Sequence, residues 1–377
     1  MNSPILLSSH DVAETIHQAG LDAYMDVLIE RLEQAFSSYD KSTYSIPARD
    51  GFRYSEPFTG LVEWMPLMQC QQSVLMKMVG YHPANPGAYA LPTILSSLSL
   101  FDVQTGQIKA LADGTLLTSL RTGAASAVAS KLLADPASST LGLIGAGAQA
   151  VTQLHALNRV FPIERVLIHD TEPSVSESFA ERIAPLQLDA IQIESASADE
   201  VASQADILCT ATSVPIGAGP VFSQQTLLKP SVHINAVGSD LPGKTELPPE
   251  ILQNSFVCPD FLTQAMVEGE CQQLAFDMQS AKQIIGPELH ELVKDPEAFK
   301  PLRQKTTVFD STGFALEDHV ALEHLLEQAR ILGIGTPLKL ETICKDPYNP
   351  YEIVFSQSAK HELFLDAQTN RTQAICD

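Results

Sequence analysis

Four charged side chains interrupt apolar stretches in the first third of the chain. They are Lys77 in VLMKMVGYH, Glu63 in LVEWMP, Arg121 in LTSLRTGAAS and Arg49 in IPARDGF. Arg and Lys bind carboxylates through charge-assisted hydrogen bonds, so cations that point inward here would suit an anionic substrate. A second interpretation follows from the alternation of side chains along a strand, which would place Lys77 and Glu63 on a face open to water.

A fifth charged residue, Asp240, ends the apolar run HINAVGSD. Ligands of open α/β sheets bind at the carboxyl ends of the strands, where a carboxylate can act as acid or base. Asp240 is therefore a candidate catalytic residue. The alternative is that its side chain only caps the following turn, LPGK.

The stretch LGLIGAGAQA, residues 141–150, has the spacing of a dinucleotide-binding turn, Gly145-x-Gly147-x-x-Ala150. The first glycine allows a sharp turn, the second lets the backbone approach a pyrophosphate, and a small third residue allows close packing of helix on strand. Ala148 and Gln149 would then lie at the helix N-terminus, whose free N–H groups suit phosphates. An ordinary tight turn in an unrelated α/β domain is the alternative interpretation.

The identity of the dinucleotide depends on Asp170, 25 residues after Gly145, at the end of the next apolar run. A carboxylate at this position accepts hydrogen bonds from the ribose hydroxyls and repels a 2′-phosphate. The following residues, Thr171 to Pro173, include no Arg or Lys. The sequence therefore favours NAD(H) over NADP(H).

The elements that must position these residues differ between the two parts of the chain. Short β-rich runs between residues 43 and 112 predict an antiparallel sheet, followed by a helix rich in small residues over 115–134. From residue 139 strands and helices alternate, which predicts a Rossmann-type, doubly wound α/β domain beside an α+β domain. Further candidate cofactor contacts lie where two apolar strands end, at Thr210, Thr212, Val237 and Gly238.

We therefore expect two domains in the 377 residues. The first, residues 1–134, would bind substrate. The second, residues 135–319, would bind NAD. The late position of the glycine turn predicts that the substrate domain comes first.

Composition limits the classes of partner. The formal net charge is −22, and 45% of residues are hydrophobic against 18% charged, which predicts a globular protein without an affinity for nucleic acid or anionic membranes. The N-terminus has no basic region before its apolar residues, so we expect no signal peptide and a cytoplasmic protein. It predicts a short strand and then a helix capped by Asp11, with Glu14 three residues on.

The distribution of metal-binding and thiol groups is also informative. Six cysteines are scattered without a CxxC pair, and no HExxH or EF-hand pattern is present. We therefore expect reduced thiols and no metal ion.

Several of these motifs together resemble the ornithine cyclodeaminase/mu-crystallin family. The resemblance covers residues 45–335 through KMVGYHPANP, LTSLRTGAASAVASKLLA, LGLIGAGAQA, INAVGSDLPGKTELPPEIL and VFDSTGFALEDHVAL. It implies that residues 1–134, completed by residues 320–377, form a substrate-binding and dimerisation domain that pairs antiparallel sheets. It also implies an inserted NAD domain and an active site in the cleft between the two domains.

The resemblance also implies a role for each charged residue. Arg49, Lys77 and Arg121 match positions that bind the substrate carboxylate, although Arg53 is a rival for the place of Arg49. Glu63 matches an acidic residue that assists at the imine. Asp240 matches the aspartate that handles the proton of the reacting amine and that mu-crystallin-like members lack.

Three functions remain open at this point. The leading hypothesis is a cyclodeaminase that converts L-ornithine into L-proline and ammonia through an imine. NAD⁺ would accept a hydride from the substrate, and the resulting NADH would reduce the cyclic imine at the end of the cycle. The second is an imine or ketimine reductase, or an alanine-type dehydrogenase, with net redox chemistry. The third is a dinucleotide-regulated binding protein without turnover.

Overall fold

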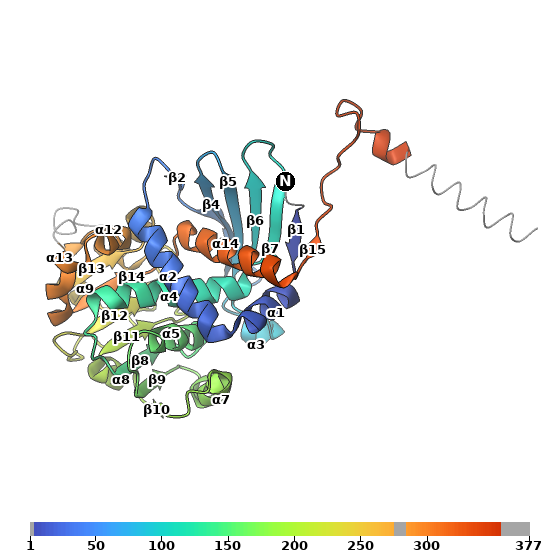
Figure 1. Cartoon of the computed structure of the whole chain (residues 1–377). Helices are drawn as coiled ribbons and strands as arrows, with labels where there is room; N and C mark the ends of the chain where they lie inside the picture. The colour runs from blue at the N-terminus through green and yellow to red at the C-terminus, as the bar shows by residue number, and fades with distance from the viewer. Residues whose placement is uncertain (1–3, 275–283, 356–377) are drawn as a thin grey trace, which may run out of the picture.

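The structure is a computed structural model that describes residues 4–274 and 284–355. Two sheets organise it, with a layer of helices between them (Figure 1). The predicted pairing of an antiparallel sheet with a doubly wound parallel sheet is confirmed. Cys376 and the predicted contribution of residues 356–377 to the first domain lie outside the described residues.

The first sheet has eight strands, and all neighbours pair in antiparallel fashion except β1 and β7. Its long strands are those expected from the apolar runs. In chain order the strands are β1 (Ile5–Leu7), β2 (Tyr44–Ser45), β3 (Asp50–Tyr54), β4 (Gly60–Gln69), β5 (Ser73–Tyr81), β6 (Ile94–Asp102), β7 (Ile108–Asp113) and β15 (Thr336–Pro337).

The second sheet has seven parallel strands in the order β10-β9-β8-β11-β12-β14-β13. Apart from the edge strand β10, its strands are buried on both faces, which explains their continuous apolar sequences. They are β8 (Thr140–Ile144), β9 (Arg165–His169), β10 (Gln192–Ser195), β11 (Ile207–Thr210), β12 (His233–Ala236), β13 (Phe256–Pro259) and β14 (Thr307–Asp310).

The layer between the sheets contains the longest helices. The helix α4 contacts β6 of the first sheet and β12 and β14 of the second, and it also packs along α5. The helices of the first sheet and the middle layer are α1 (Ser9–Ala19), α2 (Leu21–Ser38), α3 (Asn85–Tyr89), α4 (Thr115–Leu133) and α14 (Ala315–Leu332).

Shorter helices surround the second sheet. They are α5 (Ala148–Asn158), α6 (Pro173–Glu177), α7 (Phe179–Ile183), η1 (Ala184–Leu186), α8 (Ala198–Gln204), α9 (Pro249–Gln253), α10 (Leu262–Glu268), η2 (Glu270–Leu274), α12 (Leu289–Lys294), α13 (Pro296–Phe299) and η3 (Lys300–Gln304).

The start of the chain corrects one prediction. The first helix is capped by Ser8, whose side chain accepts from the backbone of Asp11 while the Asp11 carboxylate accepts from Ser8. Asp11 is thus the third helical residue and not the cap, because Ser8, three residues before Asp11, forms the capping box with it. Gly20, with φ +83°, then divides the predicted single helix into α1 and α2.

After the last strand of the second sheet, the chain returns to the first sheet through α14. The helix α14 spans the expected domain limit at residue 319 and packs against α1, α2, α4 and β4. It ends at Gly333, which adopts a left-handed conformation. The domain limits themselves stay a prediction.

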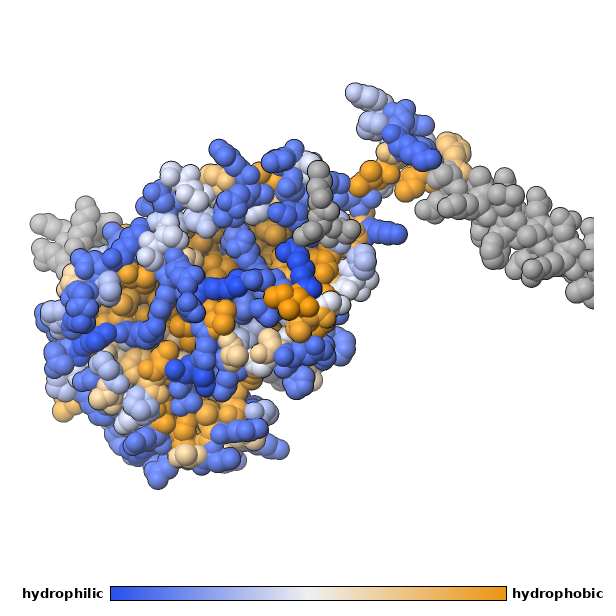
Figure 2. All heavy atoms as spheres, viewed as in Figure 1, coloured by the Kyte–Doolittle hydropathy of each residue, from blue (hydrophilic) through white to orange (hydrophobic). Residues whose placement is uncertain are grey.

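Beyond β15 the chain runs away from the body (Figure 1) and carries exposed Leu340, Ile343 and Tyr348. The face shown in Figure 2 is largely hydrophilic, as the high charge suggests, with hydrophobic side chains near the base of this segment. Within residues 4–274 and 284–355, no helix is both long and apolar enough to cross a membrane.

Candidate active site

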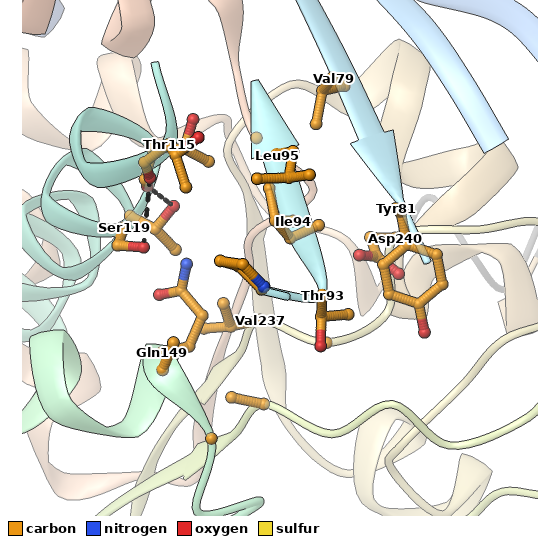
Figure 3. A pocket seen from close by; sticks show the side chains of 18 of the residues that line it. Val79, Tyr81, Thr93, Ile94, Leu95, Thr115, Ser119, Gln149, Val237 and Asp240 are labelled. Carbon is orange, nitrogen blue, oxygen red and sulfur yellow. Dashed lines mark hydrogen bonds between the residues drawn. The ribbon is translucent and has the colours of Figure 1, made fainter. Parts of the chain in front are cut away.

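A cavity of about 670 Å³ opens between the two sheets. The first sheet and α4 supply one wall, and the segments after β8, β11, β12 and β14 supply the other. Figure 3 shows side chains from both walls directed into this space, among them Tyr81, Ser119, Gln149 and Asp240. The cavity therefore lies at the carboxyl edge of the parallel sheet, where α/β folds bind their ligands.

Lys77 lies on the inner face of β5 and is 1% exposed, so the interpretation that places it on a wet face is wrong. Its ammonium donates to Oδ1 of Asp318 on α14 at 2.8 Å. Burial lowers the pKa of Lys77 to about 8, although the ion pair with Asp318 opposes this effect. Lys77 lines the cavity and can present a positive charge to a ligand there.

Arg121 projects from α4 into the same region. Its Nε donates to Oδ1 of Asp318 at 3.1 Å, and its Nη1 donates to Oε2 of Glu317 at 2.7 Å. Burial alone would raise the pKa of Asp318, but Arg121 and Lys77 together hold it below its ordinary value. One carboxylate on α14 therefore fixes two cations at the cavity wall.

Arg49 and Arg53 occupy different places. Arg49 is mostly buried, lines the cavity, and places its Nε 2.9 Å from Oε2 of Glu268. The side chain of Arg53 is 44% exposed and is not among the cavity-lining residues. Of the two candidates, Arg49 is the one whose position suits a ligand in the cavity.

Glu63 is fully buried on β4 but does not line the cavity. It accepts from Nη2 of Arg53 at 3.1 Å and lies 3.7 Å from Nη1 of Arg49. The wet-face interpretation is wrong for this residue as well. Its position suits orientation of the arginines.

Asp240 lines the cavity just after β12 and is held by a neighbour in its own turn. Nζ of Lys244, a side chain 1% exposed, donates to Oδ1 of Asp240 at 2.8 Å and to the hydroxyl of Tyr81 at 3.3 Å. Burial alone would lower the pKa of Lys244, but Asp240, Tyr81 and Glu246 together raise it above its ordinary value. The ion pair with Lys244 fixes the orientation of a carboxylate that faces the cavity.

The glycine turn after β8 fits a dinucleotide. Gly145 has φ +93°, and a Cβ there would lie 2.5 Å from the carbonyl oxygen of Ala211. Gly147 faces open space, and no side chain caps α5 at this end. The first backbone N–H groups of α5 are thus available to phosphate oxygens. Of the other candidates here, Ala148 and Gln149 line the cavity.

Asp170 stands at the end of β9, beside this turn. Its Oδ2 accepts from the backbone N–H of Ala146 at 2.8 Å, and its Oδ1 accepts from that of Glu172 at 3.0 Å. The carboxylate is therefore fixed next to the cradle, in the place expected for a ribose contact.

The segments after β11 and β12 complete the wall. Thr212, Val237 and Gly238 line the cavity, whereas Thr210 is buried within β11 and does not. These positions were predicted from the strand ends, and the structure gathers three of the four.

Sequence comparison identifies the family of a protein with this arrangement of site residues. The profile of the ornithine cyclodeaminase/mu-crystallin family matches residues 9–331. The chain belongs to this family. It is 42% identical over 349 residues to L-lysine cyclodeaminase of Streptomyces rapamycinicus, which covers 92% of this chain and 99% of that protein.

Two solved structures are similar to this member of the family. One describes how lysine cyclodeaminase recognises L-lysine, L-ornithine and L-2,4-diaminobutyric acid. It is 46% identical, covers 93% of this chain and 99% of its own, and gives a TM-score of 0.88. The other is an archaeal alanine dehydrogenase dimer with bound NAD. It is 30% identical, covers 90% and 100%, and gives a TM-score of 0.79.

Sequence reasoning missed the partners of the charged residues. Lys244 stands four residues after Asp240, and the adjacent acids Glu317 and Asp318 interrupt the apolar face of α14. These charged residues could have indicated the ion pairs with Asp240, Lys77 and Arg121. Glu268 at the end of α10 gave none, because its pairing with Arg49 joins residues more than 200 positions apart.

Proposed function

We propose that the protein is an NAD-dependent cyclodeaminase of L-α,ω-diamino acids, with L-lysine as its main substrate and L-ornithine as a second. The observation that carries this proposal is the 42% identity to L-lysine cyclodeaminase over 92% of the chain. The expectation from the motifs alone was ornithine and its product L-proline. A substrate longer by one methylene would give the corresponding six-membered cyclic amino acid.

The cation cluster supports binding of the α-carboxylate. Arg49, Lys77 and Arg121 all line the cavity, and each is already oriented by a buried acid. Such preorganisation lowers the cost of fixing the substrate, so Cα can be held in one position. Glu63 does not line the cavity, but it lies against Arg49 and Arg53 and would act by orienting these arginines.

The cofactor site supports NAD. Gly145, Gly147, Ala148 and Gln149 would hold the pyrophosphate, and Asp170 would accept from the adenosine ribose. Bound NAD⁺ supplies the oxidation of the Cα–N bond to an imine and the return of the same electrons at the end of the cycle. The reaction is redox-neutral overall, so the protein must retain the cofactor and keep water away from the imine.

Asp240 supports the proton transfer that ring closure needs. The ω-ammonium of the substrate can attack the imine carbon only after it loses a proton, because its lone pair is otherwise occupied. Asp240 is a carboxylate at the cavity wall that can accept this proton, and Lys244 fixes its orientation. Ammonia leaves with the original α-nitrogen, and the cyclic product keeps the ω-nitrogen.

The test is a substrate panel of L-lysine, L-ornithine, L-alanine, pyruvate with ammonia, and cyclic imines, with ammonia and 340 nm absorbance followed together. We expect lysine to release ammonia without a lasting rise at 340 nm. Steady consumption of NADH with a cyclic imine or a keto acid, and no ammonia from diamino acids, would establish the reductase or dehydrogenase instead. NAD binding without turnover of any compound would indicate a binding protein.

We also propose a homodimer that pairs the outer faces of two first sheets. This face carries exposed Phe52, Met68, Met78 and Leu95. Trp64 lies opposite Met78 in the strand register and packs edge-on against Phe52. An apolar face of this kind on a sheet suits a protein interface, and the similar alanine dehydrogenase is a dimer.

We propose a cytoplasmic location on the basis of the thiols and the cofactor. Cys209, Cys258 and Cys271 are buried and free. Free thiols and a need for NAD both suit a reducing compartment.

A further inference from the structure

A buried carboxylate outside the predicted site joins two walls of the cavity. Glu246 is fully buried, and its Oε1 accepts from the backbone N–H of Thr212 at 2.6 Å. Its Oε2 accepts from the backbone N–H of Gly238 at 2.9 Å. Thr212 follows β11 and Gly238 follows β12, and both line the cavity. One side chain therefore ties together two strand-end segments that face the ligand.

The glycine at position 238 is explained by this carboxylate. A Cβ on Gly238 would lie 2.3 Å from Oε1 of Glu246 and 2.7 Å from the backbone nitrogen of Thr212. The space beside Gly238 is thus occupied by protein. Gly238 is required for close approach to Glu246, in addition to any contact that it makes with a cofactor.

Glu246 is itself held by a second and a third carboxylate. Glu270 accepts from the backbone N–H groups of Glu246 and Leu247 at 2.7 and 3.3 Å. Asp310, at the end of β14, accepts from the backbone N–H groups of Glu270 and Cys271 at 2.9 and 2.8 Å. The three acids are all fully buried, and each of them binds two backbone N–H groups.

The chemistry of this chain of acids explains its rigidity. A carboxyl group that accepts one N–H on each oxygen holds two backbone positions at a fixed spacing, and losing either hydrogen bond would leave a buried donor without its partner. Each acid fixes the backbone of the next, from Asp310 at the end of β14, the neighbour of the edge strand β13, to Glu246. Of the three acids, only Glu246 contacts the backbone of Thr212 and Gly238 directly. Loops held in this way lose little entropy when a ligand binds.

We propose that Glu246 is a positioning residue for the cofactor, which sets the spacing of the segments after β11 and β12. The inference rests on the proposed function in one respect, that the ligand of this wall is NAD. Glu246 does not line the cavity, so it would act through the backbone of Thr212 and Gly238.

The test is the isosteric variant Glu246→Gln, with NADH affinity measured by fluorescence titration of the whole protein. The amide NH₂ would face one of the two backbone N–H groups, which breaks one buried hydrogen bond and pushes the two segments apart. We expect the dissociation constant for NADH to rise about tenfold. In steady state, KM for NAD should rise by more than kcat falls.

The matched control is Glu270→Gln, which creates the same defect one step further from the cavity. We expect a similar fall in melting temperature in both variants, but NADH affinity within about twofold of the original in Glu270→Gln. Unchanged affinity in Glu246→Gln would overturn the proposal, and so would an equal loss in both variants. If the unaltered protein itself fails to bind NADH, the proposed function is at fault and not this inference.

Discussion

Asp240 is the residue on which the proposed reaction depends most directly, because it faces the cavity as an ion-paired carboxylate. The variant Asp240→Asn keeps the shape but cannot accept a proton at neutral pH. We expect ammonia release from lysine to fall at least a hundredfold, in the range of general-base effects, while NADH binds as before. Ammonia release at the original rate would remove Asp240 from the mechanism.

Lys77 predicts a limit on activity at alkaline pH. Burial lowers its pKa from 10.5 to about 8, so above pH 8 the folded protein loses a charge that the unfolded chain keeps up to about 10.5. The unfolded state then binds more protons, and the contribution of Lys77 to stability rises with pH between these values. Binding of the substrate carboxylate, in contrast, weakens as Lys77 loses its charge. KM for the amino acid should therefore rise above pH 8.

The variant Lys77→Arg isolates this effect, because a guanidinium stays charged throughout that range. We expect the ratio of the KM of the original protein to that of the variant to rise between pH 7.5 and 9.5. The amine groups of the substrate titrate identically in both experiments and therefore cancel. Parallel KM profiles would show that Lys77 does not bind the carboxylate in its charged form.

The sequence identified the charged residues of the site but could not say which way Lys77 and Glu63 point. The physical reason is that both faces of the first sheet are apolar. One packs on α4 and α14, and the other carries Trp64, Met76 and Met78, so alternation along LVEWMP does not mark the inside. The charge partners mark the inside: Lys77 pairs with Asp318 on the distant helix α14, and Glu63 pairs with Arg53 on β3.

At the scale of elements, the small residues of α4 allow it to approach α5 closely. A Cβ on Gly123 would lie 2.5 Å from the carbonyl oxygen of Thr152 on α5. We expect Gly123→Ala to lower the free energy of unfolding by about 1–3 kcal/mol, as overpacking does, when measured by urea denaturation. NADH affinity should also fall, because α5 begins at the phosphate cradle.

A control for this helix exists within the chain. Gly87 in α3 has no atom within 4 Å of its missing Cβ, so Gly87→Ala should leave stability the same or slightly higher. Equal stability of the two alanine variants would show that the α4–α5 contact tolerates an added methyl group.

Elements were predictable where the local pattern was strong. The parallel strands of the second sheet were recognised from continuous apolar runs, because burial on both faces leaves no polar alternation. The short edge strand β10 was missed, since Gln192 to Ser195 are mostly exposed and polar. The stretch after the first strand was predicted as one helix, but Gly20, with a positive φ, ends α1 within it.

At the scale of the whole molecule, the proposed dimer makes a prediction about assembly. A charge at the centre of the outer sheet face, as in Met78→Glu, would be desolvated without a partner in the interface. We expect this variant to elute as a monomer in size-exclusion chromatography with light scattering. Ile331→Glu, which changes an exposed apolar residue on α14 instead, should remain dimeric. Two dimeric variants would place the interface elsewhere.

The return of the chain from the second sheet to the first passes through Ser311, Thr312 and Gly313, which line the cavity. Asp260 accepts from the hydroxyl of Thr312 and from the backbone of Gly313, and Arg49 donates to the carbonyl of Thr312. The chain crosses between the two sheets at this segment and at residues 134–139, so one of the two covalent links between the sheets is also part of the binding wall. A ligand in the cavity therefore lies directly against the backbone that joins one sheet to the other.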